Sequence, residues 1–296
     1  MAKVSGAGWD RGLMLTLCDS VDMADRVTTT ITDGIADVRM VRPEKRNALD
    51  SSMFLGLAEA GELLKTDTSV RAVVLSGEGA SFCAGLDFSS MQTLANSGDD
   101  GMEEAAARQD GNPGSMEDGR ITHLGQQVCW VWEELPVPVI AAVHGHALGG
   151  GIQIALGADI RIVHPDTKMS VREAYWGLVP DMTGTLQLNR LVRPDVAREL
   201  TYTARVFTGA EAYAMGLATR LSDDPYTDAH ELARQIAGNS PGAVRGAKEL
   251  FSRLDHDGAA DQFAAERRVI GQQIGSPNQV EAVTAGFEKR APVFVD

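Results

Sequence analysis

The segment VIAAVHGHALGGGIQ, residues 139–153, decides the fold of this chain. It opens with five apolar residues typical of a buried strand, turns at Gly145, and places three consecutive glycines, 149–151, where a helix should begin. The first N–H groups of a helix have no partner inside it, and glycine leaves them uncovered. Close packing of a helix on a strand needs only one such glycine. Three in a row therefore favour a site that binds a negatively charged oxygen.

A second glycine-containing bend, SFCAGLD at residues 81–87, directly follows a predicted strand over 71–76. A glycine in such a bend lets neighbouring N–H groups point into a cavity rather than into a sheet. This signal is weak alone, because strand-to-helix turns often contain glycine for steric reasons. It is not a dinucleotide-binding fingerprint, since Phe82 stands where the third glycine is required, and no Gly-Lys-Ser/Thr triplet follows the strand to form a phosphate loop.

Around these two segments, strands alternate with helices through the first two thirds of the chain. Strands are predicted at 27–32, 36–41, 71–76, 139–143 and 159–163, and helices at 50–65, 121–134 and from 149. Asp33-Gly34 predicts a tight hairpin between the first two strands, and Asp50 is a predicted helix cap. This alternation is typical of an α/β core.

Helical signals dominate after about residue 183. Helix starts are indicated by a capping box at Thr208–Glu211 and by the pairs Ser240-Pro241 and Ser276-Pro277. The pattern predicts a core over residues 26–205 and a C-terminal helical region over 206–296. Residues 1–25 are weakly patterned and are interpreted as an N-terminal arm. Residues 89–117 are polar and acidic, which predicts a mobile surface loop, and their length also fits a lid over a site.

Composition narrows the possible functions. The chain has 27 basic and 41 acidic residues, a net charge of −14, which argues against nucleic acid as the main partner. An anionic small ligand would have to be bound by a local patch. Three cysteines without a CxxC pair predict neither a disulfide framework nor a zinc site. No apolar run approaches about 18 residues and no signal-peptide pattern is present, so we expect a cytoplasmic protein without a membrane span.

The two glycine segments together resemble the signature segments of a known family. FCAGLDF and HGHALGGGIQIALGADIRI are similar to those of the enoyl-CoA hydratase/isomerase, or crotonase, superfamily. Further matches, in family order, are RPEKRNALD, PVPVIAAV, VREAYWGLVPDMTGT, FTGAEAYAMGLATRL and GFEKRAPVF. They cover nearly everything from residue 27 onward except the 89–117 loop. The resemblance implies a spiral of ββα units, C-terminal helices that form a homotrimer or a dimer of trimers, and an enzyme that stabilises the enolate of an acyl-CoA thioester.

Carried over by position, the resemblance assigns the chemistry to five residues. The amides of Leu86 and Gly150 would form the oxyanion hole. Hydratases of the family hold a water between two glutamates, whose positions are Gln153 and Glu173 here. Asp181 falls where dienoyl-CoA isomerases carry an aspartate, although those isomerases also have an aspartate at the Gln153 position. Because an amide cannot exchange protons at neutral pH, isomerisation with Glu173 as base is favoured over hydration.

Other interpretations stay open at this point. The chain could bind acyl-CoA with little hydratase activity, or catalyse another crotonase-type reaction such as thioester hydrolysis or decarboxylation. Asp181 could instead cap a helix, and Glu173 could form a surface ion pair with Arg172. His144 and His146 lack further ligands at metal spacing, so no metal is expected. Cys83 has no identifiable base and is interpreted as a packing thiol.

Coenzyme A is expected as part of the substrate, with no separate cofactor. The resemblance points to the backbone around Ala84 and Leu86 for its adenine and pantetheine arm. Candidate contacts for the nucleotide end are Arg42, Lys45 or Arg46, with Phe287 and Lys289 supplied by a neighbouring subunit. Asp87 and Gly149 complete the expected substrate-binding positions.

Overall fold

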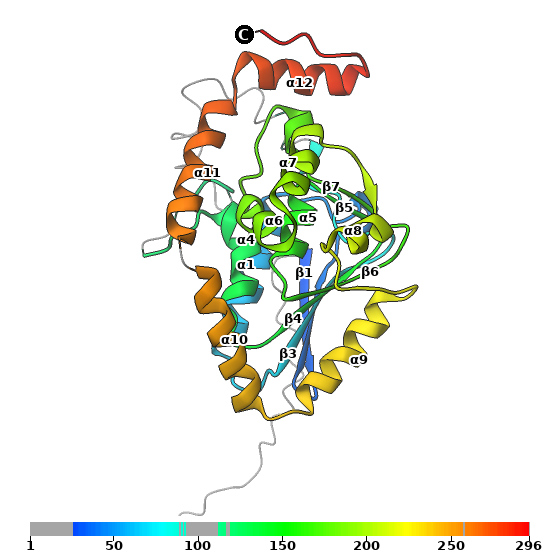
Figure 1. The fold of residues 1–296 in the computed structure, drawn as a ribbon, viewed down its shortest axis with the longest axis vertical. Helices are drawn as coiled ribbons and strands as arrows, with labels where there is room; N and C mark the ends of the chain where they lie inside the picture. The colour runs from blue at the N-terminus through cyan, green and yellow to red at the C-terminus, as the bar shows by residue number, and fades with distance from the viewer. Residues whose placement is uncertain are drawn as a thin grey trace, which may run out of the picture.

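The computed structural model describes residues 26–88, 90, 92, 112–116, 119–256 and 258–295. The predicted arm, 1–25, and most of the predicted loop, 89–117, lie outside the described residues. A six-stranded sheet forms the centre, in the order β1-β2-β3-β4-β6-β9 (Figure 1). Its strands are β1 (Val27–Thr32), β2 (Ile35–Met40), β3 (Ala72–Gly77), β4 (Val139–Val143), β6 (Ile160–Val163) and β9 (Arg220–Leu221).

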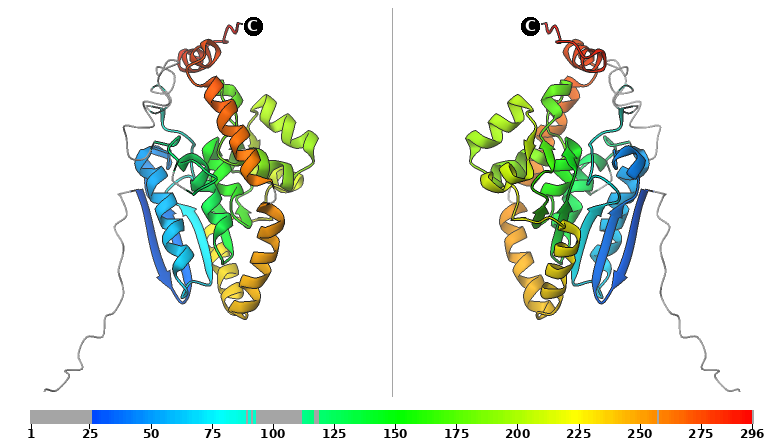
Figure 2. Two further views of the ribbon diagram at one scale, coloured as in Figure 1. Left: turned by 90° about the vertical axis from the view of Figure 1, so that its left-hand side faces the viewer. Right: turned by 90° about the vertical axis from the view of Figure 1, so that its right-hand side faces the viewer.

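The sheet is parallel except at one edge. β1 and β2 form the predicted antiparallel hairpin, and β2, β3, β4, β6 and β9 run parallel to one another. Asp33 and Gly34 have φ of 51° and 78°, the left-handed conformations that a two-residue hairpin turn requires. This hairpin lies at the outer edge of the sheet in both side views (Figure 2).

Helices cover both faces of the sheet. The helices and 3-10 turns are η2 (Pro43–Lys45), α1 (Ser51–Thr66), α4 (Leu124–Glu134), α5 (Gly150–Leu156), η3 (Glu173–Trp176), α6 (Gly184–Leu191), α7 (Pro194–Thr203), α8 (Gly209–Met215), α9 (Pro225–Ala237), α10 (Pro241–His256), α11 (Ala259–Gln273) and α12 (Pro277–Glu288). Val74 and Ile140 pack against α9, whereas their neighbours Val73 and Val139 belong to the larger core with α1 and α4. Strands buried on both faces explain the continuous apolar runs in the sequence.

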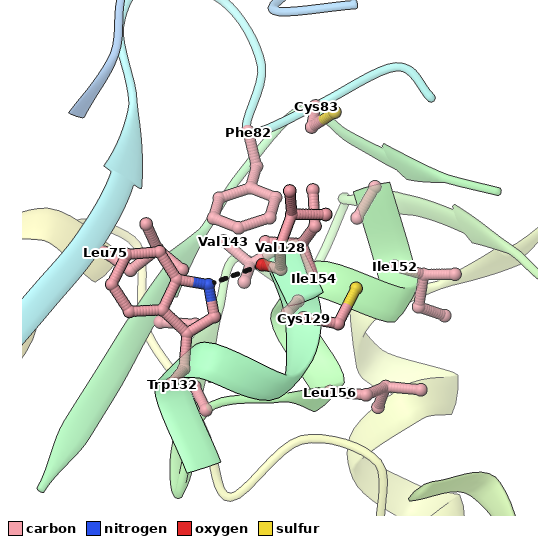
Figure 3. Packing of buried hydrophobic residues seen from close by; sticks show 14 of the residues in the cluster. Leu75, Phe82, Cys83, Val128, Cys129, Trp132, Val143, Ile152, Ile154 and Leu156 are labelled. Carbon is pink, nitrogen blue, oxygen red and sulfur yellow. Dashed lines mark hydrogen bonds between the residues drawn. The ribbon is translucent and has the colours of Figure 1, made fainter. Parts of the chain in front are cut away.

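The larger core is packed with aromatic and aliphatic side chains. Trp132 of α4 lies close to Leu75 and Phe82 in this core, and its indole Nε1 donates to the Val128 carbonyl at 2.8 Å (Figure 3). Cys83 and Cys129 are fully buried in the same cluster. The turn that follows β3 is therefore anchored in the core by its first apolar residues.

A small second sheet places the functional segments beside one another. It contains β5 (His146–Leu148), β7 (Lys168–Ser170) and β8 (Phe207–Thr208). β5 connects the Gly145 turn to α5, and a bridge between Cys83 and Ala147 ties the 81–87 bend to it. The two glycine-containing bends of the sequence thus lie side by side.

The C-terminal region is less separate from the core than predicted. β8 and β9 fall within residues 206–296 and pair with β7 and β6, so the sheets extend past the predicted boundary at 206. The capping box at Thr208–Glu211 and the Ser276 cap are confirmed. α10 and α11 then follow one side of the molecule, and α12 crosses its end (Figure 1). Within the described residues, no helix has the length and apolar character needed to cross a membrane.

Candidate active site

Two bends with close backbone contact form one wall of the site; we call residues 83–87 and 149–151 the glycine pair. Gly85 and Gly149 have φ of 87° and 54°, conformations that favour glycine. A methyl group on Gly85 would lie 2.5 Å from the Leu148 carbonyl oxygen, and one on Gly151 would lie 2.3 Å from the Cys83 carbonyl oxygen. Side chains at these positions would therefore force the two bends apart.

Two amides of the glycine pair are available for a ligand. Leu49 N donates to the Gly85 carbonyl at 2.8 Å, and Asp87 N donates to the Leu49 carbonyl at 2.9 Å. Because Gly85 and Asp87 both bond to Leu49, the N–H of Leu86 between them points away from Leu49. Gly150 is the first residue of α5, where N–H groups lack helical partners. Neither amide donates to a backbone or side-chain acceptor in the part of the chain that the structure describes.

Beside these amides lies a group that we call the carboxylate cluster: Gln153, Glu173 and residues 181–184. Gln153 Nε2 donates to Glu173 Oε1 at 2.6 Å, and both side chains are buried. Glu173 lies beside the glycine pair, since a methyl group on Gly149 would lie 3.4 Å from Glu173 Oε1. Burial raises the pKa of Glu173 to about 7. Glu173 Oε2 is also buried and has no hydrogen-bond partner among the described residues.

The orientation of the Gln153 amide follows from its other partners. Gln153 Oε1 accepts from the backbone N–H groups of Met182 and Gly184, each at 3.0 Å. An amide oxygen has two acceptor sites, so both are occupied and the nitrogen must face Glu173. Gln153 thereby connects α5 to the turn that carries Asp181.

Asp181 and Glu173 do not have the local roles, helix cap and surface ion pair, that the sequence left open for them. α6 is capped at Thr183, so Asp181 is not a helix cap. Asp181 is half-buried, and burial followed by repulsion from Glu173 and Glu266 raises its pKa to about 8. Arg172 donates to the Ala204 carbonyl at 3.0 Å, so Glu173 forms no surface ion pair with it.

The cations expected near coenzyme A occupy different environments. Arg42 Nη1 lies 2.9 Å from Asp87 Oδ2, 3.4 Å from Asp50 Oδ2 and 2.9 Å from the Ala48 carbonyl. Arg42 is thus paired inside the protein, the same ion pair occupies Asp87, and the contacts of both residues with the substrate stay predictions. Lys45 is exposed on η2. Ala84 is half-buried in the glycine pair.

The C-terminal candidates belong to α12, which packs against η3 of the same chain, and their contact with a neighbouring subunit's site stays a prediction. Phe287 lies 5.6 Å from Phe88 between ring centroids and 6.2 Å from Trp176. Gly286 lets α12 approach η3 closely, because a methyl group at this position would lie 2.7 Å from the Trp176 ring. Lys289 is exposed and ends α12.

Cysteine and histidine side chains near the glycine pair have structural partners. Cys83 Sγ donates to the Asn47 carbonyl at 3.1 Å, and burial raises the pKa of Cys83 to about 12, as expected of a packing thiol. His144 Nε2 lies 2.8 Å from the Gly79 carbonyl, and His146 Nδ1 lies 2.9 Å from Ser81 Oγ. No cluster of three metal-ligating side chains occurs among the described residues.

Two residues of the site were missed from the sequence. Asn47 Nδ2 donates to the Glu78 and Ser81 carbonyls at 3.0 and 2.8 Å and so supports the bend before the glycine pair. Its place within RPEKRNALD was the only available signal. Glu266 of α11 accepts from Thr183 N at 3.1 Å beneath the carboxylate cluster. No local pattern marks it, because its partner is 83 residues away in the chain.

The sequence is similar to those of known proteins. The profile of the enoyl-CoA hydratase/isomerase family matches residues 35–293. A short-chain-enoyl-CoA hydratase of Clostridium acetobutylicum is 32% identical over 259 residues, which are 86% of this chain and 92% of that protein. A mitochondrial methylglutaconyl-CoA hydratase of Mus musculus is 31% identical over 268 residues, 88% of this chain and 79% of that protein.

The fold is shared with solved structures. The crystal structure of an enoyl-CoA hydratase/isomerase from Pseudoalteromonas atlantica has a TM-score of 0.77 at 26% identity, covering 91% of this chain and 100% of that one. The predicted crotonase-like fold is thereby confirmed. The chain belongs to the enoyl-CoA hydratase/isomerase family.

Proposed function

We propose that this enzyme acts on an unsaturated acyl-CoA thioester and moves its double bond, with Glu173 as the base. The observation that carries the proposal is the hydrogen bond from Gln153 Nε2 to Glu173 Oε1. An amide beside Glu173 supports the proposal, because gripping a water would need a second carboxylate there. One carboxylate that removes and returns a proton suffices for a double-bond shift, whereas hydration conventionally uses an acid and a base on one water.

The thioester oxygen would be bound by the glycine pair. Removal of a proton next to the thioester leaves negative charge on that oxygen, and the amides of Leu86 and Gly150 would stabilise it. Such donors act strongly because they are fixed by the fold before the charge develops. One donor lowers the activation barrier by about 3 kcal/mol. The absence of an internal acceptor for either amide within the described residues supports this assignment.

The proton chemistry would be divided between two carboxyl groups. With a pKa of about 7, Glu173 is partly ionised near neutral pH and can act as base. With a pKa of about 8, Asp181 is mostly protonated there and can return a proton to the far end of the shifted double bond. Gln153 has no acceptor site left, so it would hold Glu173 in place rather than exchange protons.

Coenzyme A would enter as part of the substrate, with no separate cofactor. The backbone at Ala84 and the exposed cation Lys45 are the proposed contacts for its pantetheine and nucleotide ends. Phe287 and Lys289 of a neighbouring subunit are further proposed contacts for the nucleotide end, and Gly149 would allow the thioester to approach closely. A homotrimer or dimer of trimers is proposed on the family resemblance.

Hydration is the second candidate, because relatives such as those of Clostridium acetobutylicum and Mus musculus are named hydratases. In this chain it would have to proceed with Glu173 as the single ionisable group at the water position, and therefore slowly.

Incubation of the purified protein with crotonyl-CoA, a 3-enoyl-CoA and a 3,5-dienoyl-CoA tests the proposal. We expect faster conversion of the 3-enoyl or 3,5-dienoyl thioester than hydration of crotonyl-CoA. Preferred hydration of crotonyl-CoA would overturn isomerisation as the main reaction. Tight binding of all three thioesters without turnover would instead identify an acyl-CoA-binding homologue.

A further inference from the structure

A buried carboxylate of the C-terminal region lies directly beneath the carboxylate cluster. Glu266 of α11 is 3% exposed. Its Oε2 accepts from Thr183 N and from Gln126 Nε2, each at 3.1 Å, and its Oε1 accepts from Thr185 Oγ1. No lysine, arginine or histidine forms an ion pair with it in the described ranges. A buried carboxylate without an ion pair is costly, so it is expected to serve a specific purpose.

The turn that Glu266 supports has a strained backbone. Thr183 has a φ of 66°, a conformation that is unfavourable for a β-branched residue. Such strain persists only where neighbouring groups hold the backbone in place. Here three consecutive N–H groups are held: Gln153 of α5 accepts from residues 182 and 184, and Glu266 of α11 accepts from the residue between them.

This arrangement has a direct consequence for Asp181, which precedes the three held amides. If Thr183 relaxed to an ordinary conformation, the direction of the chain at Asp181 would change. Its carboxyl group would then move relative to Glu173. Gln153 alone cannot prevent this, because its oxygen holds the amides on either side of Thr183 but not that of Thr183 itself.

We propose that Glu266 is a positioning residue, which fixes the strained 181–184 turn and thereby places Asp181 opposite Glu173 for proton transfer. The catalytic part of this inference rests on the proposed function. The structural part does not, because it concerns only the turn and its hydrogen bonds. α11 would thus act on the reaction without touching the substrate.

Two substitutions separate the geometry that Glu266 provides from its charge. Glu266→Gln keeps every bond: the amide oxygen can accept from Thr183 N and Gln126 Nε2, and the amide nitrogen can donate to Thr185 Oγ1. Glu266→Ala removes all three bonds. Lys248→Met is the control, because it breaks the ion pair between the buried Lys248 of α10 and Asp159 (Nζ to Oδ2, 2.6 Å) and lowers stability without touching the turn.

Amide hydrogen exchange tests the structural part without any substrate. In Glu266→Ala we expect faster exchange at residues 182–184, with unchanged exchange in the β1–β2 hairpin. Glu266→Gln should exchange like the unsubstituted protein at these positions. Unchanged exchange in Glu266→Ala, or an equal increase in Lys248→Met, would overturn the positioning role whatever the reaction is.

Kinetics with the best of the three thioesters test the catalytic part. Glu266→Ala should lower kcat by about 10–100-fold with little change in KM, because the reacting groups are misplaced while binding is retained. Glu266→Gln should restore kcat and move the high-pH limb of the rate profile to lower pH, since a neighbouring negative charge is removed from Asp181. A kcat for Glu266→Ala equal to that of Lys248→Met would overturn the catalytic part of the proposal. If exchange is faster in Glu266→Ala but the unsubstituted protein turns over none of the thioesters, the positioning role is kept and the proposed reaction is rejected.

Discussion

The glycine pair and the carboxylate cluster lie next to each other but are built in different ways. The glycine pair consists of backbone, and its shape depends on residues such as Gly85 and Gly151 having no side chain. The carboxylate cluster consists of side chains from α5, η3, the 181–184 turn and α11, held together by hydrogen bonds between distant positions. The amides of the first region stay in place as long as the two bends keep their contact. Substitution of one side chain in the second can change the reaction.

This difference explains how one fold can support several reactions. Backbone donors stabilise negative charge on a thioester oxygen whatever happens to the enolate next. The fate of that enolate depends on which groups can exchange protons near it, and here Gln153 occupies one of those positions.

The largest effect is expected in the carboxylate cluster. Glu173→Gln should lower isomerisation by about 10³-fold or more, because the amide cannot accept the substrate proton. Acyl-CoA binding, measured by calorimetry, should survive because the glycine pair is untouched. Glu59→Gln, the same change on the exposed face of α1, is the control and should behave like the unsubstituted enzyme. Unchanged turnover in Glu173→Gln would reject Glu173 as the base.

A change in the glycine pair should have the next largest effect. In Gly150→Ala the added methyl group would lie 2.7 Å from Leu49 Cδ1 and 2.9 Å from Met182 Sδ, so these side chains must shift. The methyl group would also cover the amide that glycine leaves uncovered. We expect kcat to fall by about 10²-fold, the usual cost of losing an oxyanion donor. Gly246→Ala is the matched control, since no atom lies within 4 Å of its new methyl group. It should keep full activity and stabilise α10 by about 1 kcal/mol in thermal unfolding. A folded Gly150→Ala enzyme with normal kcat would argue against the Gly150 amide as a donor.

Gln153→Glu should change the balance of reactions by a smaller factor. A carboxylate at this position can still accept from Met182 N and Gly184 N, and its second oxygen would face Glu173 Oε1 and share a proton with it. Two carboxyl groups could then hold one water, so hydration of crotonyl-CoA should rise about tenfold. A neutral or lowered hydration rate, with unfolding temperature unchanged, would show that the missing carboxylate is not what limits hydration.

The pH dependence should show the smallest change, a few-fold variation across the neutral range. Glu173 must be ionised to act as base, so kcat/KM should rise as the pH passes about 7. Asp181 must be protonated to act as acid, so kcat/KM should fall as the pH passes about 8. The two apparent pKa values belong to the pair, because the groups repel each other. Asp181→Asn should lower the overall rate, keep the rise and lose the fall; a retained fall would assign the high-pH limb to another group.

Much of the fold could be predicted because it depends on local patterns. The Asp33-Gly34 hairpin, the β4 strand and the capping box at Thr208 all lie where the sequence indicates them. Each depends on residues within a few positions of one another, such as the residues of a turn or a cap. The main sheet was underestimated at its far edge, because β9 has two residues and no alternating pattern. Strands that short are defined by their partner rather than by their sequence.

The sequence by itself determined the glycine pair and the types of side chain available to the reaction. Positions such as 85 and 149 require a residue without a side chain, and the sequence has glycine there. Gln153 carries an amide in any fold. Only the tertiary structure decided what those side chains do. It pointed the Gln153 nitrogen at Glu173, turned Arg42 inward to Asp87, and brought Glu266 under Thr183. The physical reason is that backbone conformation is specified residue by residue, whereas pKa values and hydrogen-bond partners depend on which distant groups the fold brings within about 3–4 Å of one another.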